Sequence, residues 1–427
     1  MSATEKINVV VIGAGFGGIA CAKKLAKNEN VHVTLVDRRN HHLFQPLLYQ
    51  VATANLAAPH IARSVRSIFD KTENVTVLFD HAQDFDLDGK KVLLEKGGAL
   101  AYDYLVMATG AQTSFFGNDH WAPYVFQMKS LAGAFGIREQ VLKNIELAEN
   151  SDDPKEKELL STIAIVGGGP TGVELSGAFA DLIKAQMKDS YENFDPSTLR
   201  IVLIEGMPNL LGMFDEDQSN YTKAHLEKIG VEVLTNAMVS NIEPNKLTLK
   251  DGETIEASTI IWTAGVQATP LTQKLGAELT RGGLVIVNDQ LQLPSHENVF
   301  VIGDTAAIAY GERFVPGVAP AAVQGGEYAA DFILDKELGR KVPTAFEYND
   351  KGKMAIIGKF AAIVDVKGLK FNGFVGWLVW LLIHLLFLID VRNMVSITGA
   401  WYWAFIRNKP FARIFACLLY TSDAADE

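Results

Sequence analysis

The stretch Asn8-Val-Val-Val-Ile-Gly-Ala-Gly-Phe-Gly-Gly18 decides the fold, and its pattern recurs at Ile163-Ala-Ile-Val-Gly-Gly-Gly-Pro-Thr-Gly172. In both, an apolar β-branched run leads into a glycine-rich turn and then a helix-like stretch. The first glycine permits the tight turn, the second lets backbone N–H groups approach a pyrophosphate, and the third lets helix pack on strand. Two such units predict an α/β chain with two Rossmann-like dinucleotide-binding domains. The simplest pair of ligands for two such domains is a flavin nucleotide and a nicotinamide nucleotide.

An acidic residue ends the second strand of each unit. Val31-His-Val-Thr-Leu-Val-Asp37 and Arg200-Ile-Val-Leu-Ile-Glu205 both place a carboxylate where adenosine ribose hydroxyls are expected. No arginine follows Glu205 to receive a 2′-phosphate, which favours NADH over NADPH. Arg38 and Arg39 follow Asp37, and we expect them to lie against the adenine or pyrophosphate of the flavin nucleotide. A solvated turn is the alternative for these arginines.

Composition narrows the class of protein. The 427 residues suffice for two or three domains, and the net charge of −11 argues against a nucleic-acid partner. Cys21 and Cys417 are the only cysteines, and their spacing predicts neither a disulfide nor a metal site, which indicates a reducing compartment. No signal peptide is expected, because the chain runs directly into a strand. Without a cysteine pair, a reduced flavin must pass its electrons directly to a diffusing acceptor.

The C-terminal segment suggests where that acceptor lies. Gly373–Ile389 is apolar apart from His384, at the lower limit of roughly 17–25 residues for a spanning helix. Aromatic Trp401–Ile406 and a basic flank follow, which suits helices lying in one membrane leaflet. The tryptophans expected at the headgroup level are Trp377, Trp380, Trp401 and Trp403. A buried helix with a dimer interface and a single spanning helix are the alternatives. Residues 418–427 resemble a non-native cloning remnant.

Further motifs accompany the two loops. They are Asn40-His-His-Leu-Phe-Gln-Pro-Leu-Leu-Tyr-Gln-Val-Ala-Thr53, Tyr102-Asp-Tyr-Leu-Val-Met-Ala-Thr-Gly110, Thr263-Ala-Gly265, Val301-Ile-Gly-Asp304 and Ala319-Pro-Ala-Ala-Val-Gln-Gly-Gly326. With them, the chain resembles the type II NADH:quinone oxidoreductases, which do not pump protons, from Lys6 to Phe415. The resemblance implies electron transfer from NADH through FAD to a membrane quinone. It also implies a homodimer bound as a peripheral, monotopic membrane protein to the cytoplasmic face of the bacterial inner membrane.

The resemblance names two catalytic candidates. Glu174 matches a family glutamate that sits beside nicotinamide and flavin and is linked to quinone protonation. An acid stabilised by the helix dipole in a first turn is the alternative. Gln324 is the second candidate. The family pattern is Ala-Gln-x-Ala-x-Gln, and Pro320 replaces its first glutamine here, which leaves Gln324 as the amide able to bond a quinone carbonyl.

Cofactor-binding residues follow from the loops and the resemblance. For FAD they are Gly13, Gly15, Phe16, Gly17, Gly18, Asp37, Arg38, Arg39, Asn40, Ala82, Thr109, Gly110, Asp304, Ala319, Pro320, Ala321 and Lys359. For NADH they are Gly167, Gly169, Thr171, Gly172, Glu205 and Gly265. A helix N-cap is the alternative role of Asp304, and a plain surface position is that of Lys359.

The order of motifs predicts a split FAD domain. We expect its first part at 1–116, a connecting segment at 117–160, the NADH domain at 161–282, the returning FAD part at 283–346 and a membrane-anchoring module at 347–417. Two other functions fit the same sequence. One is a soluble NADH-dependent flavin reductase or oxidase that uses oxygen or small acceptors, and the other is a flavoprotein scaffold that responds to NADH.

Overall fold

The computed structural model describes residues 6–181, 191–387 and 391–407. The chain forms two compact units. The first comprises residues 1–43, 62–112 and 266–351, and the second residues 44–61, 113–265 and 352–427. The first unit therefore resumes at Val266, whereas we placed the returning FAD part at 283. The C-terminal segment belongs to the second unit, because its sheet packs on a helix of that unit.

A six-stranded sheet forms the centre of the first unit. Its order is β21-β22-β9-β1-β2-β5, and all neighbours are parallel except β21 and β22. Parallel strands are covered on both faces, which explains the uninterrupted apolar run at the start of the chain. The strands are β1 (Ile7–Ile12), β2 (Val31–Asp37), β5 (Val75–Phe79), β9 (Tyr104–Met107), β21 (Gln292–Leu293) and β22 (His296–Val301).

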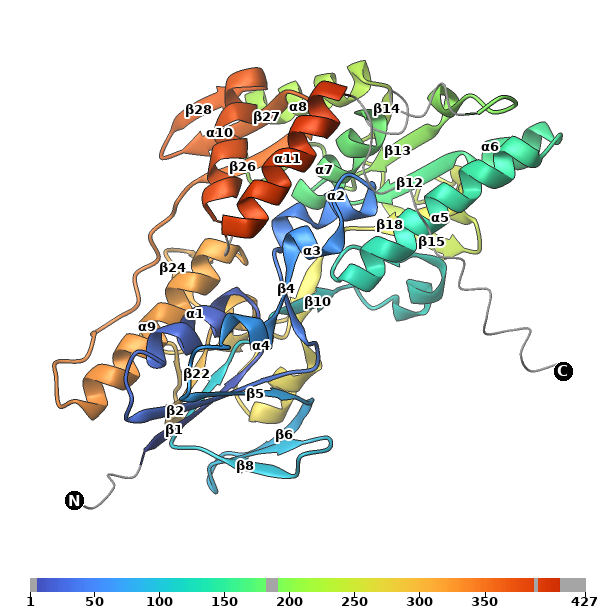
Figure 1. Cartoon of the computed structure of the whole chain (residues 1–427). Helices are drawn as coiled ribbons and strands as arrows, with labels where there is room; N and C mark the ends of the chain where they lie inside the picture. Colours follow the sequence, from blue (N-terminus) through green and yellow to red (C-terminus); the bar gives the residue numbers. More distant parts are fainter. Residues whose placement is uncertain (1–5, 182–190, 388–390, 408–427) are drawn as a thin grey trace, which may run out of the picture. The chain divides into compact units, whose positions relative to one another are not determined.

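Helices α1 (Phe16–Leu25) and α9 (Ala319–Glu337) lie side by side in the first unit (Figure 1). A Cβ atom on Gly326 would lie 2.2 Å from the carbonyl oxygen of Gly17, so only glycine allows this approach. The first half of α9 therefore lies beside the start of α1. A three-stranded antiparallel sheet completes the unit, formed by β6 (Ala82–Asp86), β7 (Lys91–Leu94) and β8 (Ala99–Ala101).

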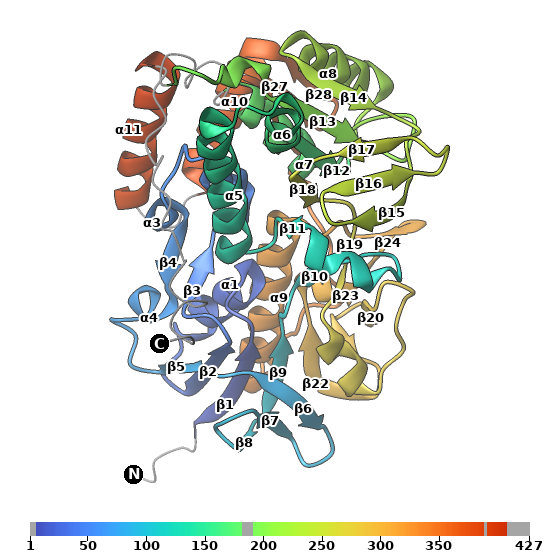
Figure 2. The same cartoon turned by 90° about the vertical axis from the view of Figure 1, so that its right-hand side faces the viewer.

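The second unit contains a five-stranded parallel sheet (Figure 2). Its order is β11 (Phe126–Gln127), β18 (Thr259–Trp262), β12 (Thr162–Val166), β13 (Arg200–Ile204) and β14 (Val231–Leu234). The helices are α2 (Leu48–Ala52), α3 (Ala58–Ile61), α5 (Leu131–Asn150), α6 (Pro154–Leu160), α7 (Pro170–Phe179) and α8 (Glu216–Lys228). A small antiparallel sheet comprises β15 (Val239–Glu243), β16 (Lys246–Leu249) and β17 (Thr254–Glu256). Both loop–helix units expected from the sequence are present.

The C-terminal segment adds an antiparallel sheet and two helices to the second unit. They are β26 (Lys353–Gly358), β27 (Ala361–Val366), β28 (Leu369–Asn372), α10 (Gly373–Leu386) and α11 (Val391–Arg407). A Cβ atom on Gly177 of α7 would lie 2.4 Å from the carbonyl oxygen of Ile357 in β26. One on Gly376 of α10 would lie 2.5 Å from that of Ala362 in β27. Close backbone contacts thus join the sheet to both helices.

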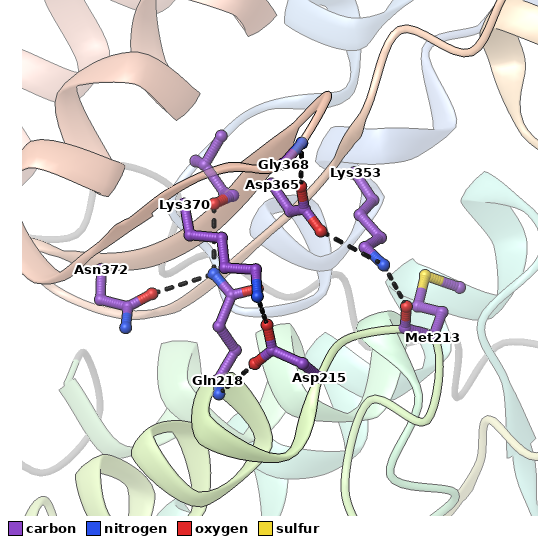
Figure 3. A network of polar contacts seen from close by, with 9 residues as sticks. Met213, Asp215, Gln218, Lys353, Asp365, Gly368, Lys370 and Asn372 are labelled. Atoms are coloured by element: carbon purple, nitrogen blue, oxygen red, sulfur yellow. Dashed lines mark hydrogen bonds and ion pairs between the residues drawn. The ribbon is translucent and has the colours of Figure 1, made fainter.

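Polar contacts tie the same sheet to α8 (Figure 3). Asp215 caps α8 by accepting a hydrogen bond from Gln218 N at 2.8 Å, and it forms an ion pair with Lys370. The Gln218 amide nitrogen donates to Val364 O at 3.1 Å and to Asn372 Oδ1 at 3.0 Å. The remaining contacts join Lys353 to Asp365 and Met213, and Gly368 to Asp365. These contacts join all three strands of the C-terminal sheet to α8 and to the segment just before it.

Among the helices that the structure describes, none is both long enough and apolar enough to cross a membrane.

Candidate functional site

The first glycine loop is held in shape by its own unit. Gly13 has a φ of +105°, and a Cβ atom there would lie 2.3 Å from the carbonyl oxygen of Ala108. A Cβ atom on Gly18 would lie 1.8 Å from Gly13 O. Asp37 accepts hydrogen bonds from Ala14 N and Arg39 N, both at 2.7 Å. The carboxylate at the end of β2 is therefore joined to the loop.

The second loop repeats this arrangement. Gly167 has a φ of +114°, and a Cβ atom there would lie 2.6 Å from Ala264 N. One on Gly172 would lie 1.9 Å from Gly167 O. Glu205 accepts hydrogen bonds from Gly168 N at 2.6 Å and Met207 N at 2.7 Å. Two separate strand–loop–helix units thus carry the same carboxylate contact.

Both loops leave room for a phosphate. Gly15 and Gly169 occupy the N-cap positions of α1 and α7, and neither helix start has a side-chain cap. A Cβ atom at either glycine would meet nothing within 4 Å. No side chain therefore caps either helix start, and the space beside each N-cap glycine is open, which fits the binding of a dinucleotide pyrophosphate. Thr171 lies in the first turn of α7.

Other predicted FAD residues gather at the edge of the first sheet. Gly110 N donates to Thr305 Oγ1 at 2.9 Å, and Thr109 Oγ1 lies 2.8 Å from Thr269 Oγ1. Asp304 lies within the 3₁₀ helix Gly303–Thr305, whose N-cap is Ile302. The alternative role of Asp304 as that helix's N-cap is therefore wrong.

Gln324 and its neighbours begin helix α9. Pro320 occupies the first turn, where its missing N–H costs nothing. The Gln324 amide is held at both ends by one residue: its nitrogen donates to Asn349 O at 3.0 Å, and its oxygen accepts from Asn349 N at 2.9 Å. Both polar atoms of the Gln324 amide are thus already hydrogen-bonded to Asn349, and its contact with a quinone stays a prediction.

The remaining FAD candidates occupy varied environments. Phe16 meets His42 edge-on at 5.1 Å between ring centroids, and His42 Nδ1 lies 2.9 Å from Ala14 O. The Asn40 amide oxygen lies 3.0 Å from His41 Nδ1. Ala82 is buried at the start of β6. Their contacts with a flavin stay predictions.

Glu174 is half-buried in helix α7 of the second unit. It is the fifth residue of α7, beyond the first turn, so the dipole alternative does not describe it. Burial raises the pKa of the Glu174 carboxyl to about 8, and a hydrogen bond from the backbone of Ile356 opposes that rise. Burial raises the pKa of Tyr49 well above its usual range, and the neighbouring Glu174 carboxyl adds to the rise. Glu174 therefore retains a proton at neutral pH.

A hydrogen-bonded chain leads from Glu174's neighbour Tyr49 to the C-terminal helices. The Gln50 amide nitrogen donates to Tyr49 Oη at 2.7 Å, and Trp401 Nε1 donates to Gln50 Oε1 at 2.7 Å. All three residues are buried. Sequence reasoning missed these roles, although Tyr49 and Gln50 belong to the distinctive motif at 40–53. Their local sequence contains no signal for a partner as distant as Trp401.

His384 lies among aromatic residues of the same unit, a packing that we did not predict from the sequence. Its ring stacks on Trp380 at 4.1 Å, and Nδ1 lies 2.8 Å from Trp380 O. Phe44 meets the same ring edge-on at 6.4 Å. Burial lowers the pKa of His384 to about 4, so the imidazole is neutral at physiological pH.

Lys359 begins the turn after β26. Its backbone N–H donates to the Asp181 carboxylate, and its ammonium lies 5.1 Å from the centroid of the Phe360 ring. Burial raises the pKa of Asp181 to about 6. The backbone contact does not depend on the lysine side chain, so the flavin contact of Lys359 and its alternative as a surface lysine both stay predictions.

The C-terminal tryptophans are placed differently from our expectation. Trp377, Trp380 and Trp401 are buried, and only Trp403 of the four is exposed. The headgroup assignment is wrong for the buried three, because aromatic packing encloses them: Trp380 and Trp401 lie 5.5 Å apart. Other apolar side chains of α10 and α11 are exposed instead. They are Phe374, Val375, Leu378, Leu382, Leu386, Val395 and Tyr402.

The described residues offer no metal site, since no three His, Cys, Asp or Glu side chains among them are grouped to hold an ion. Cys21 is fully buried, and burial raises the pKa of its thiol to about 12. A deprotonated, reactive thiolate is therefore absent at this position. Cys417 and residues 418–427 lie outside the described residues.

The chain thus has two glycine-rich loops that can bind a pyrophosphate, and each is hydrogen-bonded to a carboxylate. This arrangement is typical of oxidoreductases with two dinucleotide-binding domains. Residues 7–326 match the pyridine nucleotide-disulphide oxidoreductase family. Ndh of Mycobacterium tuberculosis, a type II NADH:quinone oxidoreductase, is 39% identical over 94% of this chain and 88% of its own length. The type II NADH:quinone oxidoreductase of Haemophilus influenzae is 32% identical over 83% of this chain and 86% of its own.

A solved structure shows the same fold. NDH2 of Plasmodium falciparum, determined in complex with NADH, superimposes with a TM-score of 0.86 at 21% identity, covering 96% of this chain and 100% of that one. The chain belongs to the type II NADH:quinone oxidoreductases, within the wider pyridine nucleotide-disulphide oxidoreductase family.

Proposed function

We propose that this protein transfers two electrons from NADH through FAD to a membrane quinone, without pumping protons. The observation that carries the proposal is the pair of glycine loops, each joined to a carboxylate by backbone hydrogen bonds. Bound FAD supplies the redox chemistry, which is the passage of electrons from NADH to the quinone. The first loop and Asp37 would hold FAD, and the second loop and Glu205 would hold NADH.

Glu174 is the proposed proton source for quinone reduction. Because burial raises its pKa to about 8, it holds a proton at neutral pH that an ordinary carboxyl would have lost. Tyr49 lies beside it, oriented by Gln50. Glu174 would donate the proton on its carboxyl oxygen to the quinone. The hydrogen bond from Gln50 holds the Tyr49 side chain in place beside it.

The apolar face of α10 supports attachment to a membrane. Phe374, Leu378, Leu382 and Leu386 recur at four-residue intervals and are all exposed, so they form a stripe along one side of the helix. An exposed stripe of this kind favours burial in the outer part of a bilayer leaflet. We propose that the protein is a peripheral membrane protein bound through this stripe.

The homodimer and the cytoplasmic face of the bacterial inner membrane stay predictions. Light scattering on the detergent-solubilised protein measures the first, and a monomer would contradict it. Protease digestion of inside-out membrane vesicles measures the second. Protection of the protein in inside-out vesicles, with cleavage in right-side-out ones, would place it on the opposite face.

Anaerobic stopped-flow spectroscopy tests the proposed reaction. NADH should bleach the flavin absorbance rapidly, and a short-chain quinone should restore it. Bleaching that only oxygen reverses would favour the oxidase alternative. A flavin that NADH does not bleach would favour the scaffold and overturn the proposal.

A further inference from the structure

Two exposed methionines lie beside Glu205. Met207 is 63% exposed to solvent and Met238 is 44% exposed, although both side chains are apolar. Met207 N donates to Glu205 Oε1 at 2.7 Å. A Cβ atom on Gly206 would lie 3.6 Å from Met238 Cε. The Met238 side chain therefore covers the backbone that joins Glu205 to Met207.

Backbone hydrogen bonds keep the two methionines together. Asn236 N donates to Met207 O at 3.0 Å, and Ala237 N donates to Glu205 O at 2.9 Å. Asn236 adopts a left-handed conformation with a φ of 57°, which turns the chain after β14 back toward the segment after β13. The main chain thus holds the two segments that carry Met207 and Met238 side by side.

The path of a bound dinucleotide leads over these side chains. The pyrophosphate belongs at the glycine loop, and Glu205 belongs at the ribose hydroxyls. The base continues beyond the ribose, away from the loop, and so reaches Gly206 and the two methionines that flank it. An exposed thioether gains from contact with an aromatic face because sulfur is polarisable.

We propose that Met207 and Met238 clamp the adenine of NADH and that peroxide oxidation of these two thioethers weakens NADH binding. The proposal rests on the proposed function, in which the second loop binds NADH. In the modification, the O–O bond of hydrogen peroxide breaks, one oxygen atom bonds to the methionine sulfur, and the other leaves as water. The thioether loses two electrons and peroxide gains them. The polar sulfoxide then replaces an apolar surface against the base.

The chain supplies its own comparison residue. Met213 lies in the same loop between β13 and α8 and is 49% exposed, so peroxide should reach it as readily. Its carbonyl oxygen is bound by Lys353 in the network of Figure 3, which joins Met213 to the C-terminal sheet, whereas Met207 and Met238 contact Glu205 and Gly206. Oxidation of Met213 should therefore leave nucleotide affinity unchanged.

The experiment uses the FAD-loaded protein and ADP-ribose, which carries the adenosine half of NADH but cannot reduce the flavin. Calorimetry should show that Met207→Ala and Met238→Ala each raise the Kd by about two- to tenfold. Met213→Ala should leave it unchanged. Peroxide treatment of the natural protein should raise the Kd similarly, while mass spectrometry shows sulfoxide at both positions. Methionine sulfoxide reductases should restore the affinity.

The double variant Met207→Leu/Met238→Leu separates the effect of oxidising these two methionines from the effect of oxidising other residues. Leucine keeps the apolar volume but accepts no oxygen, so this variant should bind ADP-ribose like the natural protein and resist peroxide. Reduced nicotinamide mononucleotide, which lacks adenosine, should bleach the flavin equally well in all variants. A peroxide-induced loss of affinity in the double leucine variant would overturn the modification site, and unchanged affinity in both alanine variants would overturn the clamp. If the untreated protein binds no ADP-ribose, the proposed function itself fails.

Discussion

Loss of the Glu174 proton should limit quinone reduction at alkaline pH. With a pKa of about 8, roughly 90% of the Glu174 carboxyl is protonated at pH 7 and roughly 10% at pH 9. At the ordinary pKa of a glutamate, under roughly 1% would be protonated even at pH 7. If Glu174 is the proton donor, the rate of flavin reoxidation by quinone should therefore fall about tenfold from pH 7 to pH 9.

Single-turnover measurements isolate this step. Stopped-flow traces between pH 6 and pH 9.5 should show the decline in reoxidation by quinone but not in reduction by NADH. Glu174→Gln should slow reoxidation by about 100-fold or more and remove the decline near pH 8, because glutamine neither ionises nor donates an acidic proton. Asp181→Asn is the matched control, since Asp181 is a second half-buried acid with a raised pKa of about 6, two residues beyond the end of α7. If the reoxidation rate of Glu174→Gln still declined near pH 8, Glu174 would not be the proton donor.

Three further changes test other parts of the structure. Glu205→Ala should weaken NADH binding and relax the rejection of NADPH, since the carboxylate meets the ribose and repels a 2′-phosphate; identical KM values for both nucleotides before and after the change would contradict this. Asp215→Ala should lower the free energy of unfolding by about 1 kcal/mol, because it removes the cap of α8. Lys370→Gln, which removes only the exposed ion pair, should cost less in the same denaturant titration. Leu378→Ser/Leu382→Ser should prevent flotation with anionic vesicles while preserving NADH–dye activity, and retained flotation would exclude the stripe on α10 as the anchor.

The two dinucleotide units could be predicted because their signals are local. Gly13 and Gly167 adopt left-handed conformations that follow from residue type, and each loop needs only the strand before it and the helix after it. The carboxylates of Asp37 and Glu205 come at the end of the next strand, where a parallel sheet brings them to the same edge. Their backbone hydrogen bonds at both loops follow from that register.

The surroundings of Glu174 could not be predicted in the same way. Trp401 donates to Gln50 across 351 residues of sequence, and Ile356 reaches the Glu174 carboxylate from a strand that follows the whole nucleotide domain. No sequence motif in either segment indicates that it contacts the other. The raised pKa of Glu174 depends on these distant segments closing over α7, and burial of that kind is a property of the tertiary structure.

Helix α10 shows why the tryptophans were misplaced. A helix that is apolar all round gives no hydrophobic pattern from which to choose its buried face. Trp377 and Trp380 lie on the side that packs against β27, where Gly376 permits close approach to Ala362. The stripe from Phe374 to Leu386 is left on the exposed side. One helix thus completes the fold with one face and offers an apolar surface with the other. Truncation at Gly373 would remove both, which is why single-face substitutions test membrane attachment and truncation does not.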